Sequence, residues 1–333
     1  MINEERGGTR RTEAGASTGE KAGVRATRAE ADKKANACPV CAEADKKANA
    51  GAATGKIALS KQSDEDRYGL AGLHQKLLKL LLAFDAFCKR HGIEYFLDSG
   101  TLLGAVRHGG FIPWDDDLDV AMKRSEYEKF LKVKGEMPAP YRVVLPSDFA
   151  PYFFDFSVRV IDTATRLREE TAADEAQHGY ENRASLDIFV LDDAPDGKGA
   201  FRRTVFRQKM LYGEAMQYRY DRKLHSYHGV DRLKVAVLRT LGRFRKLPRI
   251  LKDKEKLDVK YAGKRGADYY ASNGILSWLD KRFPKICYRA AVDLPFCGVM
   301  LPCPVDYDKT LTVMYGDYMT PPPEEERKPI HAE

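Results

Sequence analysis

Apolar residues recur along most of the chain at the spacings of helices and buried strands. From Leu70 to Phe87 they stand three and four residues apart, which predicts an amphipathic helix ending at His91-Gly92. Further helical patterns cover 101–107, 125–134 and 307–314, and the stretch from about 201 to 273 is mostly helical. Short apolar runs predict strands at 93–97, 118–122, 141–145, 153–161, 185–191, 288–295 and 298–302. This intermixing predicts an α/β (α+β) fold, a mixed sheet flanked by helices, with a helical insertion at about 201–273.

The first 62 residues have a different character. They consist mainly of Ala, Gly, Lys, Arg and Glu, they contain the sequence AEADKKANA twice, at 29–37 and 42–50, and the first aromatic residue of the chain is Tyr68. Such a segment cannot bury enough apolar area to offset the entropy lost on ordering. We therefore expect residues 1–62 to be a disordered tail and residues 63–333 to fold.

Composition narrows the class of protein. With 333 residues, 43% of them apolar, the chain has enough material for a buried core. Its 6 cysteines are too few for a disulfide scaffold. No run approaches the roughly 18 apolar residues of a membrane span, and the polar N-terminal stretch lacks the apolar part of a signal peptide. We expect a cytoplasmic protein.

The most informative segment runs from Asp115 to Asp119, where all residues but one are aspartates. Like charges this close repel one another unless water or a cation screens them. A solvated loop explains the cluster poorly, because apolar runs flank it on both sides. An EF-hand calcium loop would use Glu126 as its last ligand, but Val120 stands where that loop requires glycine.

The third interpretation is a catalytic metal site. In a strand, Asp117 and Asp119 point to the same face, about 6.6 Å apart at Cα. Mg²⁺ (or Mn²⁺) binds carboxylates together with phosphate oxygens. Asp187 is a lone acid in the apolar strand 185–191, and we expect it to supply the third carboxylate from a neighbouring strand.

Gly100 and Thr101 lie between a predicted strand and a predicted helix. Backbone N–H groups at such a turn, together with the helix dipole, can hold a phosphate. Arg107 and His108 follow and are candidates for phosphate contacts, although either could equally be a surface cation. A turn of this kind, about 17 residues before an Asp-x-Asp strand, is the layout of a nucleotidyltransferase-type fold.

At these residues the chain resembles the LicD-type phosphotransferases, which also include the fukutin-related proteins. The resemblance covers roughly residues 68–331, and its central motif is highly specific. Members of the family often end in two histidines after a Pro-Pro-Glu-Glu run, of which only His331 is present here. The matching segments are 96–108, 110–120, 159–163, 186–192, 315–319 and 322–325.

The resemblance implies a nucleotidyltransferase-like catalytic domain over 63–333. It implies metal-dependent transfer of a phospho-head group, such as phosphocholine or a phospho-polyol, from a CDP-linked donor to a glycan or glycolipid hydroxyl. Such reactions modify cell-surface glycans, for example lipopolysaccharide or teichoic acid. Asp117 and Asp119 would then hold the metal, with Asp115 assisting and Asp187 as the third carboxylate and orienting group.

Two other functions stay open at this point. A true nucleotidyltransferase would use the same acids but add the nucleotide itself to its acceptor. A non-catalytic protein of the same fold would bind a glycan or a membrane. The folded part also contains Cys88, Cys287, Cys297 and Cys303, whose spacing does not decide between a zinc site and single core thiols.

Positive charge concentrates between Arg202 and Lys256, with 17 Lys and Arg against 5 Asp and Glu. Residues 232–256 include a basic amphipathic helix that ends near Leu247-Pro248. Such a helix suits an anionic membrane surface, an acidic glycopolymer, or a core position with a solvated basic face. We expect no nucleic acid, since no nucleic-acid-reading motif accompanies the charge, and peripheral contact with the inner face of the membrane is one of the options.

Overall fold

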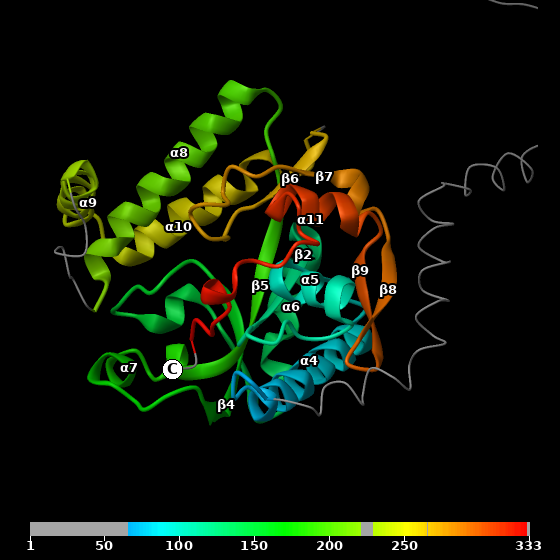
Figure 1. Ribbon diagram of the computed structural model, residues 1–333. Helices are drawn as coiled ribbons and strands as arrows, with labels where there is room; N and C mark the ends of the chain where they lie inside the picture. The colour runs from blue at the N-terminus through cyan, green and yellow to red at the C-terminus, as the bar shows by residue number, and fades with distance from the viewer. Residues whose placement is uncertain (1–65, 221–228, 265, 332–333) are drawn as a thin grey trace, which may run out of the picture. The chain divides into compact units, whose positions relative to one another are not determined.

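The computed structural model describes residues 66–220, 229–264 and 266–331 (Figure 1). The tail expected at 1–62 therefore lies outside the described residues. In the described part, the principal sheet has the strand order β1-β2-β5-β4-β3, and β6 pairs with both β5 and β7. Its strands are β1 (Phe96–Leu97), β2 (Leu118–Lys123), β3 (Tyr141–Val144), β4 (Val158–Arg166), β5 (Arg183–Asp193), β6 (Asp268–Ala271) and β7 (Phe283–Pro284).

Strands β2 and β5 pair in parallel, whereas the other pairs of this sheet are antiparallel. A separate hairpin consists of β8 (Ala291–Phe296) and β9 (Val299–Pro304). The helices are α4 (Ala71–His91), α5 (Ser99–His108), α6 (Arg124–Val133), α7 (Ala172–Ala176), α8 (Lys198–Ala215), α9 (Gly229–Gly242), α10 (Leu247–Asp258) and α11 (Tyr307–Tyr315). The mixed α/β sheet flanked by helices that the sequence predicted is confirmed.

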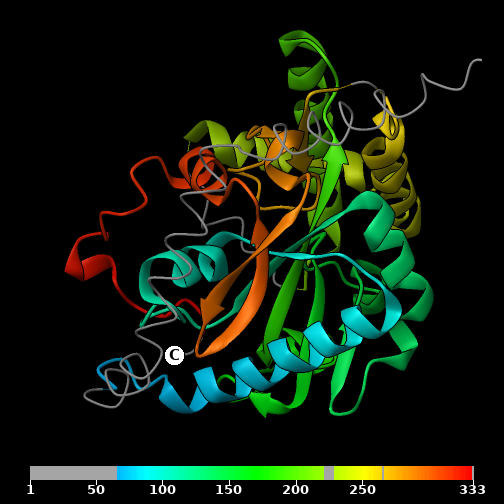
Figure 2. The same ribbon diagram turned by 90° about the vertical axis from the view of Figure 1, so that its right-hand side faces the viewer.

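The main core lies between the sheet and helices α4 and α6. Alternate residues of β2, Leu118 and Val120 among them, are fully buried against Phe84 of α4 and Phe130 of α6. Because side chains alternate along a strand, Asp119 between them points to the opposite face. Figure 2 shows α4 running along the sheet with the β8–β9 hairpin beside it.

Most predicted elements occur with shifted ends, and three details differ. Helix α5 begins at Ser99 instead of Thr101. The strand predicted at 288–295 begins only at Ala291, because a short 3₁₀ helix, Lys285–Tyr288, occupies the residues before it. Pro248 lies in the first turn of helix α10, which begins at Leu247, and does not end a helix, since its missing N–H and fixed φ suit that turn.

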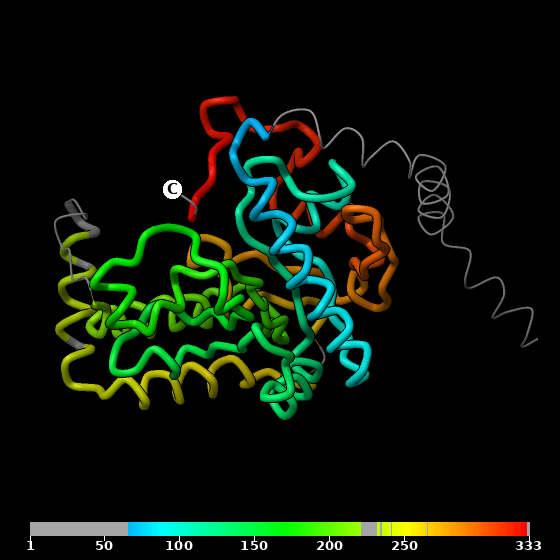
Figure 3. Tube along the Cα trace, turned by 90° about the horizontal axis from the view of Figure 1, so that it is seen from below, coloured from blue at the N-terminus to red at the C-terminus, as the bar shows by residue number. Residues whose placement is uncertain are grey.

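The stretch 201–273 is helical except at its end. Helices α8, α9 and α10 fill most of it, but Asp268–Ala271 form strand β6 on β5. Figure 3 shows α9 and α10 on the opposite side of the described chain from the β8–β9 hairpin. Within the described residues, no helix combines the length and the apolar character needed to cross a bilayer.

Candidate functional site

The parallel pairing of β2 and β5 places two of the predicted site residues side by side. Asp119 of β2 is in register with Asp187 of β5. Both lie on the face opposite the main core, with Asp117 and Asp115 in the segment that leads into β2. The third carboxylate expected from a neighbouring strand is thus next to the acidic motif.

The start of α5 packs directly on these acids. The Gly100 N–H donates to Asp119 Oδ2 over 3.1 Å, and the Asp119 N–H donates to Thr101 Oγ1 over 2.8 Å. A Cβ atom at Gly100 would lie 2.5 Å from Asp115 Oδ2 and 3.5 Å from Asp119 Oδ2. The glycine therefore leaves the space that the two carboxylates occupy at the helix N-terminus.

The first residues of α5 show further signs of a built site. Ser99 adopts a positive φ of 46°, a conformation that costs free energy for a non-glycine residue. Asp98 is 2% exposed, and its Oδ1 atom has no hydrogen-bond partner among the described residues. Burial raises the pKa of Asp98 to about 7. Unpaired buried oxygen atoms and backbone strain are features that cluster at functional sites.

The carboxylates raise one another's pKa. At Asp117, burial and then Asp187 raise the pKa to about 6. At Asp115 and Asp119, burial is again the largest cause, and Asp117 comes next, so both pKa values lie well above the usual range. The repulsion among these groups is the kind that a bound divalent cation offsets.

Asp187 has a cationic partner that sequence reasoning missed. Arg159 of β4 is in register with Asp187 and donates from Nε to its Oδ1 over 2.9 Å. The same guanidinium donates to Asp155 over 2.8 Å and to Glu181 over 2.9 Å. Burial lowers the pKa of Arg159, but these three carboxylates raise it well above its usual value. Burial raises the pKa of Asp187, and Arg159 opposes that rise.

The C-terminal segment also reaches the acidic motif. Asp116, 2% exposed, accepts hydrogen bonds from the Ile330 and His331 N–H groups over 3.0 and 2.6 Å, and its Oδ1 lies 3.0 Å from His331 Nδ1. His331 Nδ1 is 3.8 Å from Asp117 Oδ2. Asp116 thus anchors the C-terminal segment beside the cluster. Figure 3 shows this segment, in red, passing the start of α4, where Arg67 pairs with Glu324.

Tyr315, at the end of α11, lies close to the same acids. Burial raises the pKa of its hydroxyl well above the usual value, and Asp119 and Asp98 are the next causes. Its ring packs edge-on against Trp278 at 5.4 Å. The sequence marks this tyrosine only as part of the segment 315–319 that resembles the family. Its position near the acids could not be predicted, because α11 lies almost 200 residues after β2 and meets it only in the fold.

Arg107 and His108 lie at the other end of α5 from Gly100, about 10 Å along the helix axis. Arg107 donates to the Tyr318 carbonyl over 3.0 Å. His108 packs edge-on against Trp114 at 6.4 Å, and burial followed by Arg107 lowers its pKa to about 4. The structure therefore does not bring these two residues to the acidic cluster, and their contact with phosphate stays a prediction.

The calcium-loop alternative does not fit. Val120 is fully buried inside β2, and Glu126 of α6 is held by Lys129 at 2.9 Å and by the Glu94 N–H at 3.1 Å. A freely solvated loop does not fit either, because Asp116 is buried and its neighbours are partly so.

In the described part of the chain, no three His, Cys, Asp or Glu side chains are arranged to hold a metal by themselves. Mg²⁺ does not require such a cage, since it binds through one or two carboxylates plus substrate phosphates and water. The half-buried, mutually repelling carboxylates around Gly100 fit that mode. Of the four cysteines in the folded part, Cys88, Cys287 and Cys303 are buried free thiols, and Cys297 is partly exposed.

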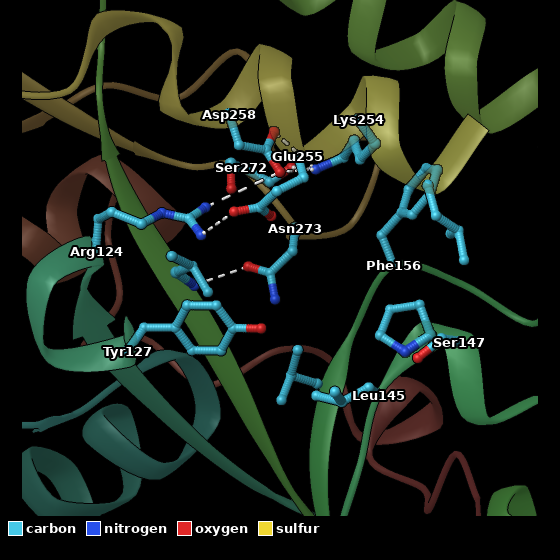
Figure 4. A pocket seen from close by; sticks show the side chains of 14 residues that line it. Arg124, Tyr127, Leu145, Ser147, Phe156, Lys254, Glu255, Asp258, Ser272 and Asn273 are labelled. Carbon is cyan, nitrogen blue, oxygen red and sulfur yellow. Dashed lines mark hydrogen bonds and ion pairs between the residues drawn. The ribbon is translucent and has the colours of Figure 1, made fainter. Parts of the chain in front are cut away.

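A cavity of about 170 Å³, whose lining residues Figure 4 shows, lies on the face of the sheet opposite the acidic cluster. Val190, which lines it, is three residues from Asp187 and so points away from the acidic cluster. The charged side chains that line the cavity pair with one another: Arg124 with Glu255 at 3.0 Å and Lys254 with Asp258 at 2.7 Å. This cavity is therefore separate from the acidic site.

Comparisons with known proteins agree with this geometry. Over 259 residues, which cover 76% of this chain and 92% of the relative, it is 29% identical to the lipopolysaccharide cholinephosphotransferase LicD of Haemophilus influenzae. Over 44 residues, 13% of this chain and 9% of the relative, it is 55% identical to the human and mouse ribitol 5-phosphate transferase FKRP. Residues 92–193 match the family model described as LicD/FKTN/FKRP, nucleotidyltransferase domain. The chain therefore carries a LicD-family domain over residues 92–193, the segment that contains β2, β5 and the four acids Asp115, Asp117, Asp119 and Asp187.

Proposed function

We propose that this protein transfers a phospho-head group from a CDP-activated donor to a hydroxyl of a glycan or glycolipid. The observation that carries the proposal is the cluster of Asp115, Asp117, Asp119 and Asp187 around the start of α5, inside the LicD-family domain. The relatives are named for transfer of choline phosphate and of ribitol 5-phosphate, which supports phosphocholine or a phospho-polyol as the group transferred.

The residues present fit a divalent cation. We propose that Asp117 and Asp119 hold Mg²⁺ or Mn²⁺ together with phosphate oxygens of the donor, with Asp115 assisting. The cation would neutralise the charge that builds on the leaving CMP. Asp115 and Asp119 already meet at Gly100, where no Cβ separates them.

The protein's own groups would orient both substrates. The N-terminus of α5, at Gly100 and Thr101, would place a donor phosphate, since N–H groups and the helix dipole favour anions there. Asp187, fixed by Arg159, would orient the acceptor hydroxyl and accept its proton as the new P–O bond forms. Burial raises the pKa of Asp187, which makes its carboxylate a better proton acceptor.

A true nucleotidyltransferase is the second candidate, because the matching family model describes a nucleotidyltransferase domain. That enzyme would release pyrophosphate from a nucleoside triphosphate, whereas the proposed enzyme releases CMP from a CDP-linked donor. Mass spectrometry of the products separates the two reactions.

The test uses CDP-choline and CDP-ribitol as donors with extracted glycolipid as acceptor, and CMP release as the readout. Asp117→Asn and Asp119→Asn should each abolish CMP release while the melting temperature holds or rises, because each removes a like charge from the cluster. Asp280→Asn, at an exposed position, is the matched control and should keep full turnover. Retained turnover in both site variants would overturn the proposal.

A further inference from the structure

Helix α9 and the turn after it expose a stripe of apolar side chains. Leu233, Val237 and Phe244 are 65%, 50% and 84% exposed. Leu233 and Val237, at positions i and i+4, lie on the same face of α9, and Phe244 stands in the turn that follows the end of the helix at Gly242. Large apolar side chains grouped in this way mark an interaction surface, unlike single exposed residues. We call Leu233, Val237 and Phe244 the α9 stripe.

The stripe does not form the contact between α9 and the rest of the described chain. That contact uses the other side of α9, where Leu238 fits against Gly213 of α8: a Cβ atom at Gly213 would lie 2.4 Å from Leu238 Cδ1. A Cβ atom at Gly242 would likewise lie 2.3 Å from the Glu214 carbonyl oxygen. Figures 1 and 3 show α9 at the outer edge of the α8–α10 region. The α9 stripe therefore faces outward from a firmly packed helix.

Exposed arginines flank the α9 stripe. Arg232 and Arg243 are both exposed, and each directly precedes a residue of the stripe, Leu233 or Phe244. The surrounding segment, 202–256, carries 17 Lys and Arg against 5 Asp and Glu. An outward apolar stripe bordered by cations is the arrangement of helices that lie in a membrane interface.

We propose that the α9 stripe and its flanking arginines dock the protein on an anionic membrane surface. The apolar side chains enter the boundary between headgroups and acyl chains, and Arg232 and Arg243 contact the anionic headgroups. Docking needs no turnover, so it can hold or fail independently of the proposed reaction.

Two other occupants fit the same surface less well. An acidic glycopolymer would pair with the arginines but would leave the α9 stripe in water. A second copy of the chain would bring two strongly basic surfaces together, which like-charge repulsion disfavours. The membrane is the occupant that uses both the apolar and the cationic groups.

Flotation of the full chain with vesicles tests the proposal. Wild type should float with phosphatidylcholine vesicles that contain about 30% phosphatidylglycerol, and much less with pure phosphatidylcholine. Leu233→Ser/Phe244→Ser should lower the vesicle-bound fraction at least about tenfold, because it removes the apolar contribution. Arg232→Glu/Arg243→Glu should remove the dependence on anionic lipid.

The controls separate docking from folding and from catalysis. Ile286→Ser replaces an apolar residue that is 52% exposed elsewhere and should float as wild type does. Asp117→Asn should also float normally. Absence of wild-type flotation, equal flotation of the stripe variant, or a stripe-dependent dimer in place of vesicle binding would each overturn the proposal.

Discussion

The close packing of Gly100 against the acids allows a test that separates activity from stability. In Gly100→Ala, the new Cβ atom would stand 2.5 Å from Asp115 Oδ2, well inside van der Waals contact. The carboxylate is the far end of a side chain, so it can move away by about 1 Å. The contact to Asp119 Oδ2, at 3.5 Å, needs no adjustment. The substitution therefore displaces one site carboxylate and little else.

We expect Gly100→Ala to change stability and activity in opposite directions. Alanine in place of glycine within a helix gains up to about 1 kcal/mol, which for a chain of this size raises the melting temperature by up to about 3 °C. A displacement of about 1 Å in a catalytic constellation can cost roughly 100-fold in rate. We expect Gly100→Ala to melt at or above the wild-type temperature. Its rate of CMP release should fall by about ten- to a hundredfold.

Gly104→Ala is the matched control on the same helix. Its Cβ would lie 2.4 Å from the Gly110 carbonyl oxygen, a backbone atom that cannot rotate away. We expect this variant to lose about 1–3 kcal/mol of stability from overpacking. Calorimetry and Mn²⁺ titration of both variants, alongside turnover, make the comparison. Wild-type turnover and Mn²⁺ affinity in Gly100→Ala, or a melting temperature as low as that of Gly104→Ala, would refute the reasoning.

Three further predictions concern the described chain. Asp116→Ala should release the segment held at His331 and cost about 1–3 kcal/mol, so trypsin should remove the C-terminal peptide faster, as mass spectrometry would detect. Asp174→Asn should cost about 2 kcal/mol in urea unfolding at pH 7. The Arg168 hydrogen bonds hold the pKa of Asp174 below its usual value, so its stabilising effect is present above the unfolded-state pKa and is lost as the pH falls through the folded-state pKa. Phe84→Ala, at a fully buried position, should cost about 3–5 kcal/mol by thermal unfolding.

Each of these predictions has an outcome that contradicts it. Unchanged trypsin cleavage in Asp116→Ala would mean that Asp116 does not anchor the segment. A constant stability difference between wild type and Asp174→Asn from pH 7 down to pH 2 would contradict the ion-pair argument. Phe206→Ala, at a position 64% exposed, should be near neutral, and a loss equal to that of Phe84→Ala would contradict the burial argument.

Local pattern was enough for much of the fold. The helix α4 and its end at Gly92, which adopts a left-handed conformation with φ of 61°, follow from apolar spacing and the glycine. The strands around Asp119 and Asp187 follow from apolar runs, and a lone acid inside such a run was enough to suggest that Asp187 joins the motif. These features depend on residues close together in the chain, so the sequence alone determined them. The sequence did not predict strands β6 and β7, because they are short and follow a helical stretch.

Other parts of the candidate site were decided only by the tertiary structure. The sequence suggested that the strand of Asp187 neighbours that of Asp119, but periodicity does not say which strand lies on its other side. The pairing of β5 with β4, and with it the Arg159–Asp187 pair, could therefore not be predicted. Asp116 meets His331 only because the chain returns to the acidic motif 215 residues later. Contacts of this kind depend on how loops close and layers pack, where many arrangements share the same local pattern and the free energy of the whole core selects among them.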